Sequence, residues 1–207
     1  FKRHAGFDVV VYAGDGVAGK QIPHSMNLVP EMIWVKNRND GNRNWIVYHK
    51  GLNGGSSPED YYLKLDSTDS ESDDTFWNDT APTATHFTVG SYPNVNDSTA
   101  GRTQIAMLFA SVSGISAVGS YTGSGSTGQT ITTGFQPRFV ILRNVSDGGH
   151  WYVLDTTRGW GSGDDKHMQL DNNSGNGTYN FGAPTSNGFT LDFYNDSNSK
   201  YIYYAHA

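Results

Sequence analysis

The chain has 207 residues, which suits one large domain or two small ones, and its formal net charge is −6. This acidic balance, without any cluster of lysine and arginine, excludes the basic surface that nucleic-acid binding requires. The absence of cysteine excludes disulfides and thiolate metal sites. No stretch approaches the roughly 18 apolar residues of a membrane-spanning helix. We therefore expect neither a nucleic-acid partner nor insertion into a membrane.

Small polar residues dominate the composition. Charged residues make up only 16% of the chain, below the usual share of about 25%, and Gly, Ser, Thr, Asn and Asp are abundant. This composition is typical of short strands joined by polar turns. Because no window shows a sustained period of 3.6 residues, we predict an all-β fold with little or no helix, built from sandwich-like units of the lectin or jelly-roll kind.

The first half of the chain predicts a series of short strands separated by turn signals. The run at 31–36 is almost continuously apolar, as in a strand buried on both faces. Asp40-Gly41 is the turn dipeptide of the hairpin that follows. A long polar loop is expected at 67–83. The predicted strands lie at 7–13, 21–24, 31–36, 45–48, 61–65, 86–89 and 103–109.

The second half repeats this order at an offset of roughly 106 to 109 residues, as a duplication with short insertions would. Trp45 recurs as Trp151, each at the start of the return strand of a hairpin, and this recurrence favours core packing for both. If the duplication is real, the segments at 32–36 and 139–143 occupy equivalent places.

We therefore divide the chain into a first β repeat, 1–112, and a second β repeat, 113–207. Each repeat of about 100 residues can bury a modest core. The sequence leaves open whether the two repeats form separate domains or one closely packed unit.

Three features occur in both halves and identify a resemblance. One is an opening Tyr-x-Gly-x-Gly. Another is Gly-Phe-x-Pro before an apolar strand that ends in Lys or Arg, a motif that the second copy keeps and the first copy replaces with Asn-Leu-Val-Pro. The last is a closing aromatic strand with a relative of Ala-Phe-Ala. In this order and twice over, they resemble a repeat domain of tail fibre and tail-associated proteins of tailed bacteriophages, marine cyanophages among them. The segments are 12–16 and 121–125, 27–30 and 134–137, and 108–110 and 205–207.

The resemblance implies a β-rich module of the virion tail, made in the host cytoplasm and placed at the host-facing part of the particle. Its implied partners are a host cell-surface glycan or another receptor, together with other virion tail proteins. Fibres of this kind are commonly homotrimers. No catalytic residue carries over from the family, so we expect a binding module without enzyme activity and without a cofactor.

Two other functions compete with host attachment. One is a purely architectural module that spaces other tail parts. The other is a glycan-degrading enzyme, because the two carboxylates of such an enzyme need not be close in sequence. A cluster of carboxylates in one groove would favour the enzyme, and a loop aromatic present in only one copy would favour binding.

Both halves contain G-x-G-x-x-G after a strand, at 14–19 and 123–128. A dinucleotide site requires a helix next, whose N-terminus holds the pyrophosphate. Strand-like residues follow instead, so we predict glycine hairpin turns without nucleotide affinity.

Trp160 is the leading candidate for a ligand contact. It lies in a loop rich in glycine and aspartate, near the position of Gly54-Gly55 in the first copy, which offers no aromatic counterpart. An exposed indole there would suit the apolar face of a sugar, whereas a buried one would close the edge of the core. Arg158 in the same loop is a second candidate. Trp77 is a third, although its alignment with Tyr179 favours packing.

The acidic stretch at 66–74 offers a weak metal site. Asp66, Asp69 and Glu71 supply the carboxylate oxygens that calcium prefers. The stretch lacks the mid-loop glycine and the final glutamate of an EF-hand, so a solvated loop is the favoured interpretation.

Overall fold

A computed structural model of the chain describes residues 5–161, 163–173 and 177–207. It confirms the all-β class, since strands form its sheets and the described helices are single 3-10 turns. The chain divides into two compact units. The first comprises Phe1–Asp66 and Glu71–Ala110, and the second comprises Ser67–Ser70 and Ser111–Ala207. The division after Ala110 lies two residues before the predicted one, and the sequence gives no sign that Ser67–Ser70 belongs with the second unit.

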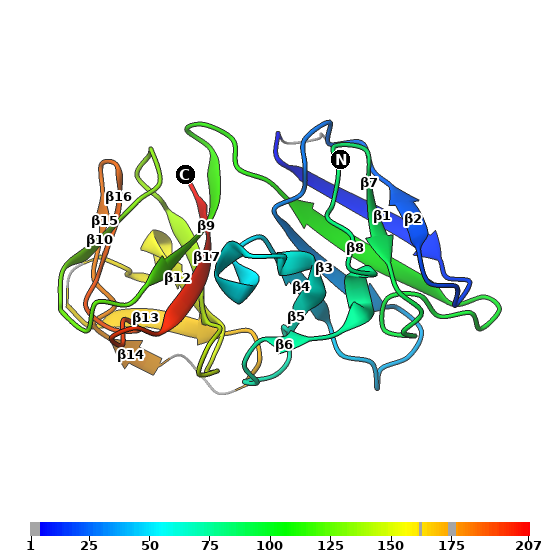
Figure 1. The fold of residues 1–207 in the computed structure, drawn as a ribbon. Helices are drawn as coiled ribbons and strands as arrows, with labels where there is room; N and C mark the ends of the chain where they lie inside the picture. The colour runs from blue at the N-terminus through cyan, green and yellow to red at the C-terminus, as the bar shows by residue number, and fades with distance from the viewer. Residues whose placement is uncertain (1–4, 162, 174–176) are drawn as a thin grey trace. The chain divides into compact units, whose positions relative to one another are not determined.

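The first unit contains a six-stranded antiparallel sheet (Figure 1). Its central strand at 32–37 has buried residues on both faces, as the apolar run at 31–36 predicts. The order across the sheet is β1 (Phe7–Ala13), β8 (Thr103–Phe109), β3 (Met32–Asn37), β4 (Ile46–His49), β5 (Tyr61–Lys64) and β6 (Ser72–Asp73).

A second layer in this unit pairs β2 (Lys20–Pro23) with β7 (His86–Val89). Residues of both layers form one hydrophobic cluster, so the core lies between the two sheets, as in a sandwich. Its buried members include Ile22, Phe87 and Val89 from the small sheet and Ile33, Val35, Ile46, Ala106 and Leu108 from the large one.

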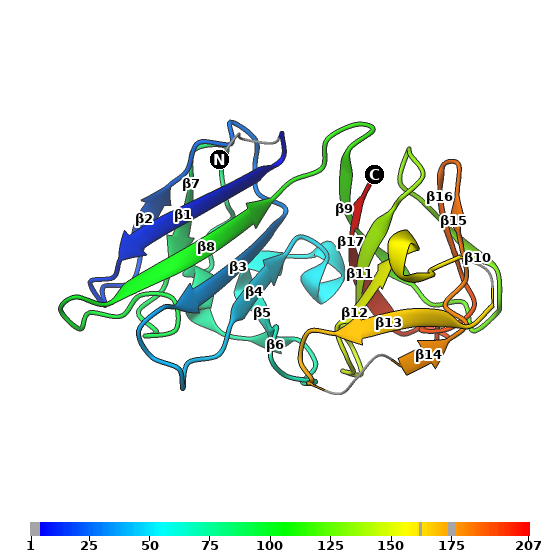
Figure 2. The same ribbon diagram turned by 180° about the vertical axis from the view of Figure 1, so that it is seen from behind.

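The second unit repeats this arrangement (Figure 2). Its large sheet has the order β9 (Ser116–Thr122), β17 (Lys200–His206), β11 (Phe139–Asn144), β12 (Tyr152–Asp155), β13 (Asp165–Gln169) and β14 (Gly177–Tyr179). Its small sheet joins β10 (Gln129–Thr132), β16 (Gly188–Leu191) and β15 (Pro184–Thr185).

Strand order and pairing register are those that a duplication predicts. Met32 lies opposite Phe109 in the first unit, and Phe139 lies opposite His206 in the second. Five residues further along each strand, Asn37 pairs with Gln104 and Asn144 with Tyr201. The segments that the sequence aligns therefore hold the same places in their sheets.

Short 3-10 turns complete the described structure. They are η1 (Leu52–Gly55), η2 (Pro58–Asp60), η3 (Thr75–Trp77) and η4 (Thr156–Arg158). The strand β6 and the turn η3 both lie inside the stretch that the sequence predicts as a plain polar loop. None of the helices in the described ranges is long and apolar enough to cross a membrane.

The structure corrects one alignment between the repeats. The carbonyl of Phe76 accepts from the N–H of Gly90, and the carbonyl of Phe181 accepts from the N–H of Asp192. Phe76 and Phe181 are thus equivalent, and both are buried. Trp77 is therefore not the counterpart of Tyr179, because short insertions shift the register between the copies.

Candidate ligand-binding site

The repeated Tyr-x-Gly-x-Gly motif ties the first strand of each unit to a loop near the end of the unit. The hydroxyl of Tyr12 donates to the carbonyl of Val95 at 2.6 Å, and the hydroxyl of Tyr121 donates to the carbonyl of Tyr194 at 3.0 Å. Burial raises the pKa of both phenols above the usual value, which keeps them protonated as donors. The tyrosine is therefore a structural anchor in both copies.

The first glycine of the motif lies directly against the backbone of the same loop. A Cβ at Gly14 would lie 2.4 Å from the carbonyl oxygen of Asp97, and one at Gly123 would lie 2.0 Å from that of Asp196. Only glycine fits such a close approach. The loop that receives it is repeated as well, as Asn96-Asp97-Ser98 and Asn195-Asp196-Ser197.

The buried asparagine of this loop holds the glycine turn by hydrogen bonds. Asn96 Oδ1 accepts from the backbone N–H groups of Asp15 and Gly16, at 2.8 and 3.2 Å. Asn195 Oδ1 accepts from the N–H of Ser124 at 2.8 Å. The turns lead into β2 and β10, which are strands. The helix that a dinucleotide site requires is therefore missing at both places.

One part of the glycine prediction is wrong. The strands on either side of each turn do not pair with each other, because β1 pairs with β8 and β2 pairs with β7. The turn carries the chain from the large sheet to the small one, so it is an inter-sheet connection rather than a hairpin.

Asp97 of the first unit gives a prediction about acid stability. Burial alone raises its pKa, but hydrogen bonds from Arg102, Thr99 and Asn37 hold the pKa well below the usual range. A carboxylate of this kind stabilises the fold above its unfolded pKa of about 3.9, and the stabilisation is lost as pH falls toward the folded value.

We expect Asp97→Asn to destabilise the chain at pH 7, and the difference from the wild type to shrink steadily below about pH 4. Urea unfolding of both proteins between pH 7 and pH 2 measures this. A difference that stays constant over the whole range would contradict the assignment.

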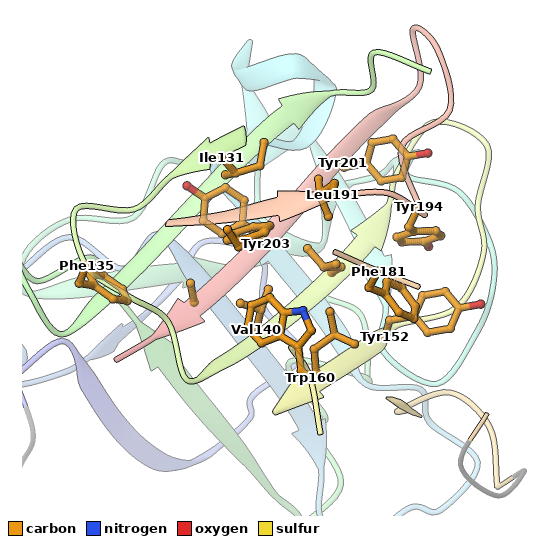
Figure 3. Close-up of a cluster of buried hydrophobic side chains, with 14 residues drawn as sticks. Ile131, Phe135, Val140, Tyr152, Trp160, Phe181, Leu191, Tyr194, Tyr201 and Tyr203 are labelled. Atoms are coloured by element: carbon orange, nitrogen blue, oxygen red, sulfur yellow. The ribbon is translucent and has the colours of Figure 1, made fainter. Parts of the chain in front are cut away.

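The structure corrects the assignment of Trp160 as an exposed platform. Its side chain is only 3% exposed and belongs to the hydrophobic cluster of the second unit (Figure 3). The indole lies edge-on to the ring of Phe189, with 6.0 Å between centroids. A ligand has no access to it, so the buried alternative applies.

The other two candidate ligand contacts, Trp77 and Arg158, do not form a common site with Trp160. Trp77 is 2% exposed and packs edge-on against Tyr48, 5.8 Å away between centroids. Arg158 is exposed at the end of η4 and lines neither of the two pockets described below.

Two of the three candidate metal ligands accept hydrogen bonds from the backbone through their carboxylates. Asp66 accepts from the backbone N–H of Trp45 at 3.2 Å, and Glu71 accepts from that of Asn53 at 2.7 Å. The backbone N–H of Asp69 is held by Ser67 Oγ at 3.0 Å. Over the described ranges, no group of three or more histidine and carboxylate side chains is placed to hold a metal. The solvated loop remains the favoured interpretation.

A pocket of about 220 Å³ in the second unit lies beside the glycine turn. Two segments line it, the turn after β9 and the segment that carries the repeated Asn-Asp-Ser motif. The pocket wall combines one exposed aromatic ring with hydroxyl, amide and carboxylate groups. Its lining residues are Gly125, Ser126, Thr127, Asp192, Phe193, Tyr194, Asn195, Asp196 and Ser197.

Phe193 is the apolar part of this pocket and forms half of an exposed aromatic pair. Its ring is stacked on Tyr179, with 4.6 Å between centroids and 20° between planes. The two side chains are 36% and 47% exposed. Tyr179 in turn stacks on His167 at 5.2 Å. Burial lowers the pKa of His167, so the imidazole is neutral and extends the stack as an uncharged ring.

Buried rings fix the position of Phe193 from behind. Phe181 approaches it edge-on at 5.1 Å between centroids. Tyr152, from β12, lies 6.2 Å away. An exposed ring held on a rigid core is preorganised for contact with a flat apolar surface.

The first unit keeps the aromatic but not the polar lining. Tyr92 is 37% exposed and stacks on Phe76 at 4.5 Å, so it holds a place similar to that of Phe193. When the two copies are aligned on their strands, Val17 and Ala18 are the equivalents of Ser126 and Thr127. The second copy thus has hydroxyl groups where the first has aliphatic side chains.

A wider groove of about 480 Å³ lies in the first unit along the edge strand β1. Its wall consists of Asp8, Val9, Val10, Val11, Pro23, His24 and Ser25. Asp8 is engaged by Ser25, whose backbone N–H and hydroxyl donate at 2.9 and 2.7 Å. Without an aromatic platform, this groove is the weaker candidate.

Fold and pocket together define an all-β protein of two units with corresponding strand order, the second of which carries a small, aromatic-lined polar pocket. The chain belongs to the family described as a domain of unknown function, DUF7483, whose model matches residues 2–207. No match was found among curated proteins or among solved structures.

Proposed function

We propose that the chain is a binding module without enzyme activity whose second unit holds a saccharide at the Phe193–Tyr179 pair. The observation that carries the proposal is an exposed, stacked aromatic pair at the mouth of a pocket lined by hydroxyl and carboxylate groups. An aromatic face supplies apolar contact to the C–H face of a sugar ring, and polar side chains fix its hydroxyls.

The proposed setting is a bacteriophage tail, where the module would bind a glycan of the host surface as part of a homotrimeric fibre with other tail proteins. Support for this setting comes from the repeated motifs that resemble tail fibre domains. The acidic net charge of the chain suits a ligand held by stacking and hydrogen bonds rather than by charge.

The pocket contains two carboxylates, the feature that would favour a glycan-degrading enzyme. Each is held in a structural hydrogen bond through one oxygen, since Asp192 Oδ1 accepts from the N–H of Gly128 at 2.7 Å and Asp196 Oδ2 accepts from the hydroxyl of Tyr201 at 2.9 Å. Glycoside hydrolysis requires one carboxyl group to deliver a proton to the leaving oxygen. Binding is therefore the better-supported function, and release of reducing sugar from a bound glycan would contradict it.

Phe193→Ala should lower saccharide affinity about fivefold or more, because it removes the stacking surface, which is worth about 1 kcal/mol or more. Ligands selected on a glycan array with the wild-type chain would be titrated calorimetrically. The matched control is Tyr92→Ala, which removes an equally exposed ring from the first unit and should leave affinity unchanged. An unchanged affinity of Phe193→Ala would contradict this site.

A further inference from the structure

We infer that the saccharide taken by this pocket carries no acidic group. The inference rests on the proposed function and adds the chemical class of its ligand.

The pocket wall is acidic. Its lining includes two carboxylates, Asp192 and Asp196, and no lysine, arginine or histidine among the described residues. Proteins bind uronic acids, sialic acids and phosphorylated sugars through cationic side chains or unoccupied backbone N–H groups. At the glycine turn, the N–H groups of Ser124 and Gly125 are already taken by Asn195. An anionic sugar would face two carboxylates, and the described lining offers no cationic side chain to offset them.

The carboxylates are fixed in place, so they cannot easily turn away from an anionic ligand. Asp192 is held through Oδ1 by Gly128, and Asp196 is held by Tyr201, which also accepts from the Asp196 backbone N–H at 2.9 Å. Over the described part of the chain, no protein donor reaches Asp192 Oδ2 or Asp196 Oδ1. These oxygens are acceptors suited to the hydroxyl or amine protons of a sugar.

Asp192 is also a difference between the copies. The equivalent position in the first unit is Gly90. Val89 pairs with Lys20 as Leu191 pairs with Gln129, and Gly90 and Asp192 follow directly. A Cβ at Gly90 would lie 2.0 Å from the carbonyl oxygen of Thr75, so the first unit leaves no room for a side chain there. At this position only the second unit has room for a carboxylate. In the first unit a carboxylate from another segment, Asp74, hydrogen-bonds the Tyr92 side chain.

The pocket volume suits a single sugar ring. About 220 Å³ is the space of about seven water molecules at roughly 30 Å³ each. A ring of this size would contact Phe193 and the hydroxyls of Ser126 and Thr127 together. An acidic substituent on it would therefore lie within a few ångströms of a fixed carboxylate, where repulsion is only partly screened.

The test uses matched pairs of ligands that differ only in the oxidation of the C6 carbon. The probes are methyl glucoside against methyl glucuronide and methyl galactoside against methyl galacturonide, together with neutral and acidic glycans of equal length on an array. We expect the wild-type chain to bind the neutral member of a pair about tenfold more tightly at low salt. The ratio should shrink as ionic strength rises.

Asp192→Asn is the decisive variant. Its amide oxygen can still accept from Gly128, so the pocket keeps its shape while it loses one charge. The neutral-to-acidic ratio should fall severalfold in this variant. It should stay unchanged in Asp73→Asn, which removes an exposed carboxylate of the first unit.

The outcomes separate the inference from the function on which it rests. Equal or tighter binding of the acidic members would overturn the inference and leave the saccharide site standing. A ratio that is the same in Asp192→Asn and the wild type would also overturn it. Failure of every neutral and acidic glycan to bind would overturn the proposed function itself.

Discussion

Replacement of Trp160 by alanine should lower the free energy of unfolding by about 3–5 kcal/mol. The indole is buried in the cluster that joins both sheets of the second unit, and it contacts Phe189 of the small sheet. Removing it would leave a cavity lined by groups from both layers, and such a site can collapse only if the two sheets move closer together. The measurement is urea unfolding followed by circular dichroism.

The matched control for Trp160 is Arg158→Ala in the same loop. Arg158 is exposed, so the change should stay within about 0.5 kcal/mol. The chain with Trp160→Ala should also bind saccharide normally at temperatures where it is folded. A loss of affinity per folded molecule, with stability unchanged, would restore Trp160 as a ligand contact and contradict the structure.

Gly123→Ala should be a strongly damaging methyl addition in the second unit. The new carbon would lie 2.0 Å from the Asp196 carbonyl, which is backbone and cannot turn aside. Either the turn or the Asn-Asp-Ser loop would have to move, and both form the pocket. We expect a loss of about 3 kcal/mol or more in stability, together with loss of saccharide binding.

Gly161→Ala provides the comparison for this substitution. A Cβ at Gly161 has no neighbour within 4 Å, so alanine should cost little there. The melting temperatures of the Gly123→Ala and Gly161→Ala variants, compared with that of the wild type, measure the difference. If Gly123→Ala melts within a few degrees of the wild type, the close approach of the turn to the loop is not as described.

The fold can be predicted from the sequence because its signals are local and repeated. Alternating and apolar runs mark the long strands, and the recurrence of these runs is enough to align β3 with β11. The two-residue strands β6 and β15 escape prediction, since such short elements have no periodicity of their own. The inter-sheet role of the glycine turns escapes it as well, because strand partners that are distant in sequence decide it.

The site cannot be predicted in the same way. Trp160 has polar neighbours in sequence, which suggest an exposed loop. In the structure the buried carboxylate of Asp165 accepts from the N–H groups of Gly161 and Phe181, at 2.9 and 2.8 Å. These bonds hold the loop against the core, and the indole is buried with it. Phe193 and Tyr179 meet only through the fold. The sequence does contain one signal for this site, an aromatic residue next to the repeated Asn-Asp-Ser segment.

A titration of the ¹⁵N-labelled chain with a neutral saccharide chosen on the glycan array tests the central claim most directly. The amide signals of residues 125–127 and 192–197 should shift most, and these shifts should vanish in Phe193→Ala but persist in Tyr92→Ala. Shifts that map to other residues of the chain, or that survive in Phe193→Ala, would contradict the assignment of this pocket as the saccharide site.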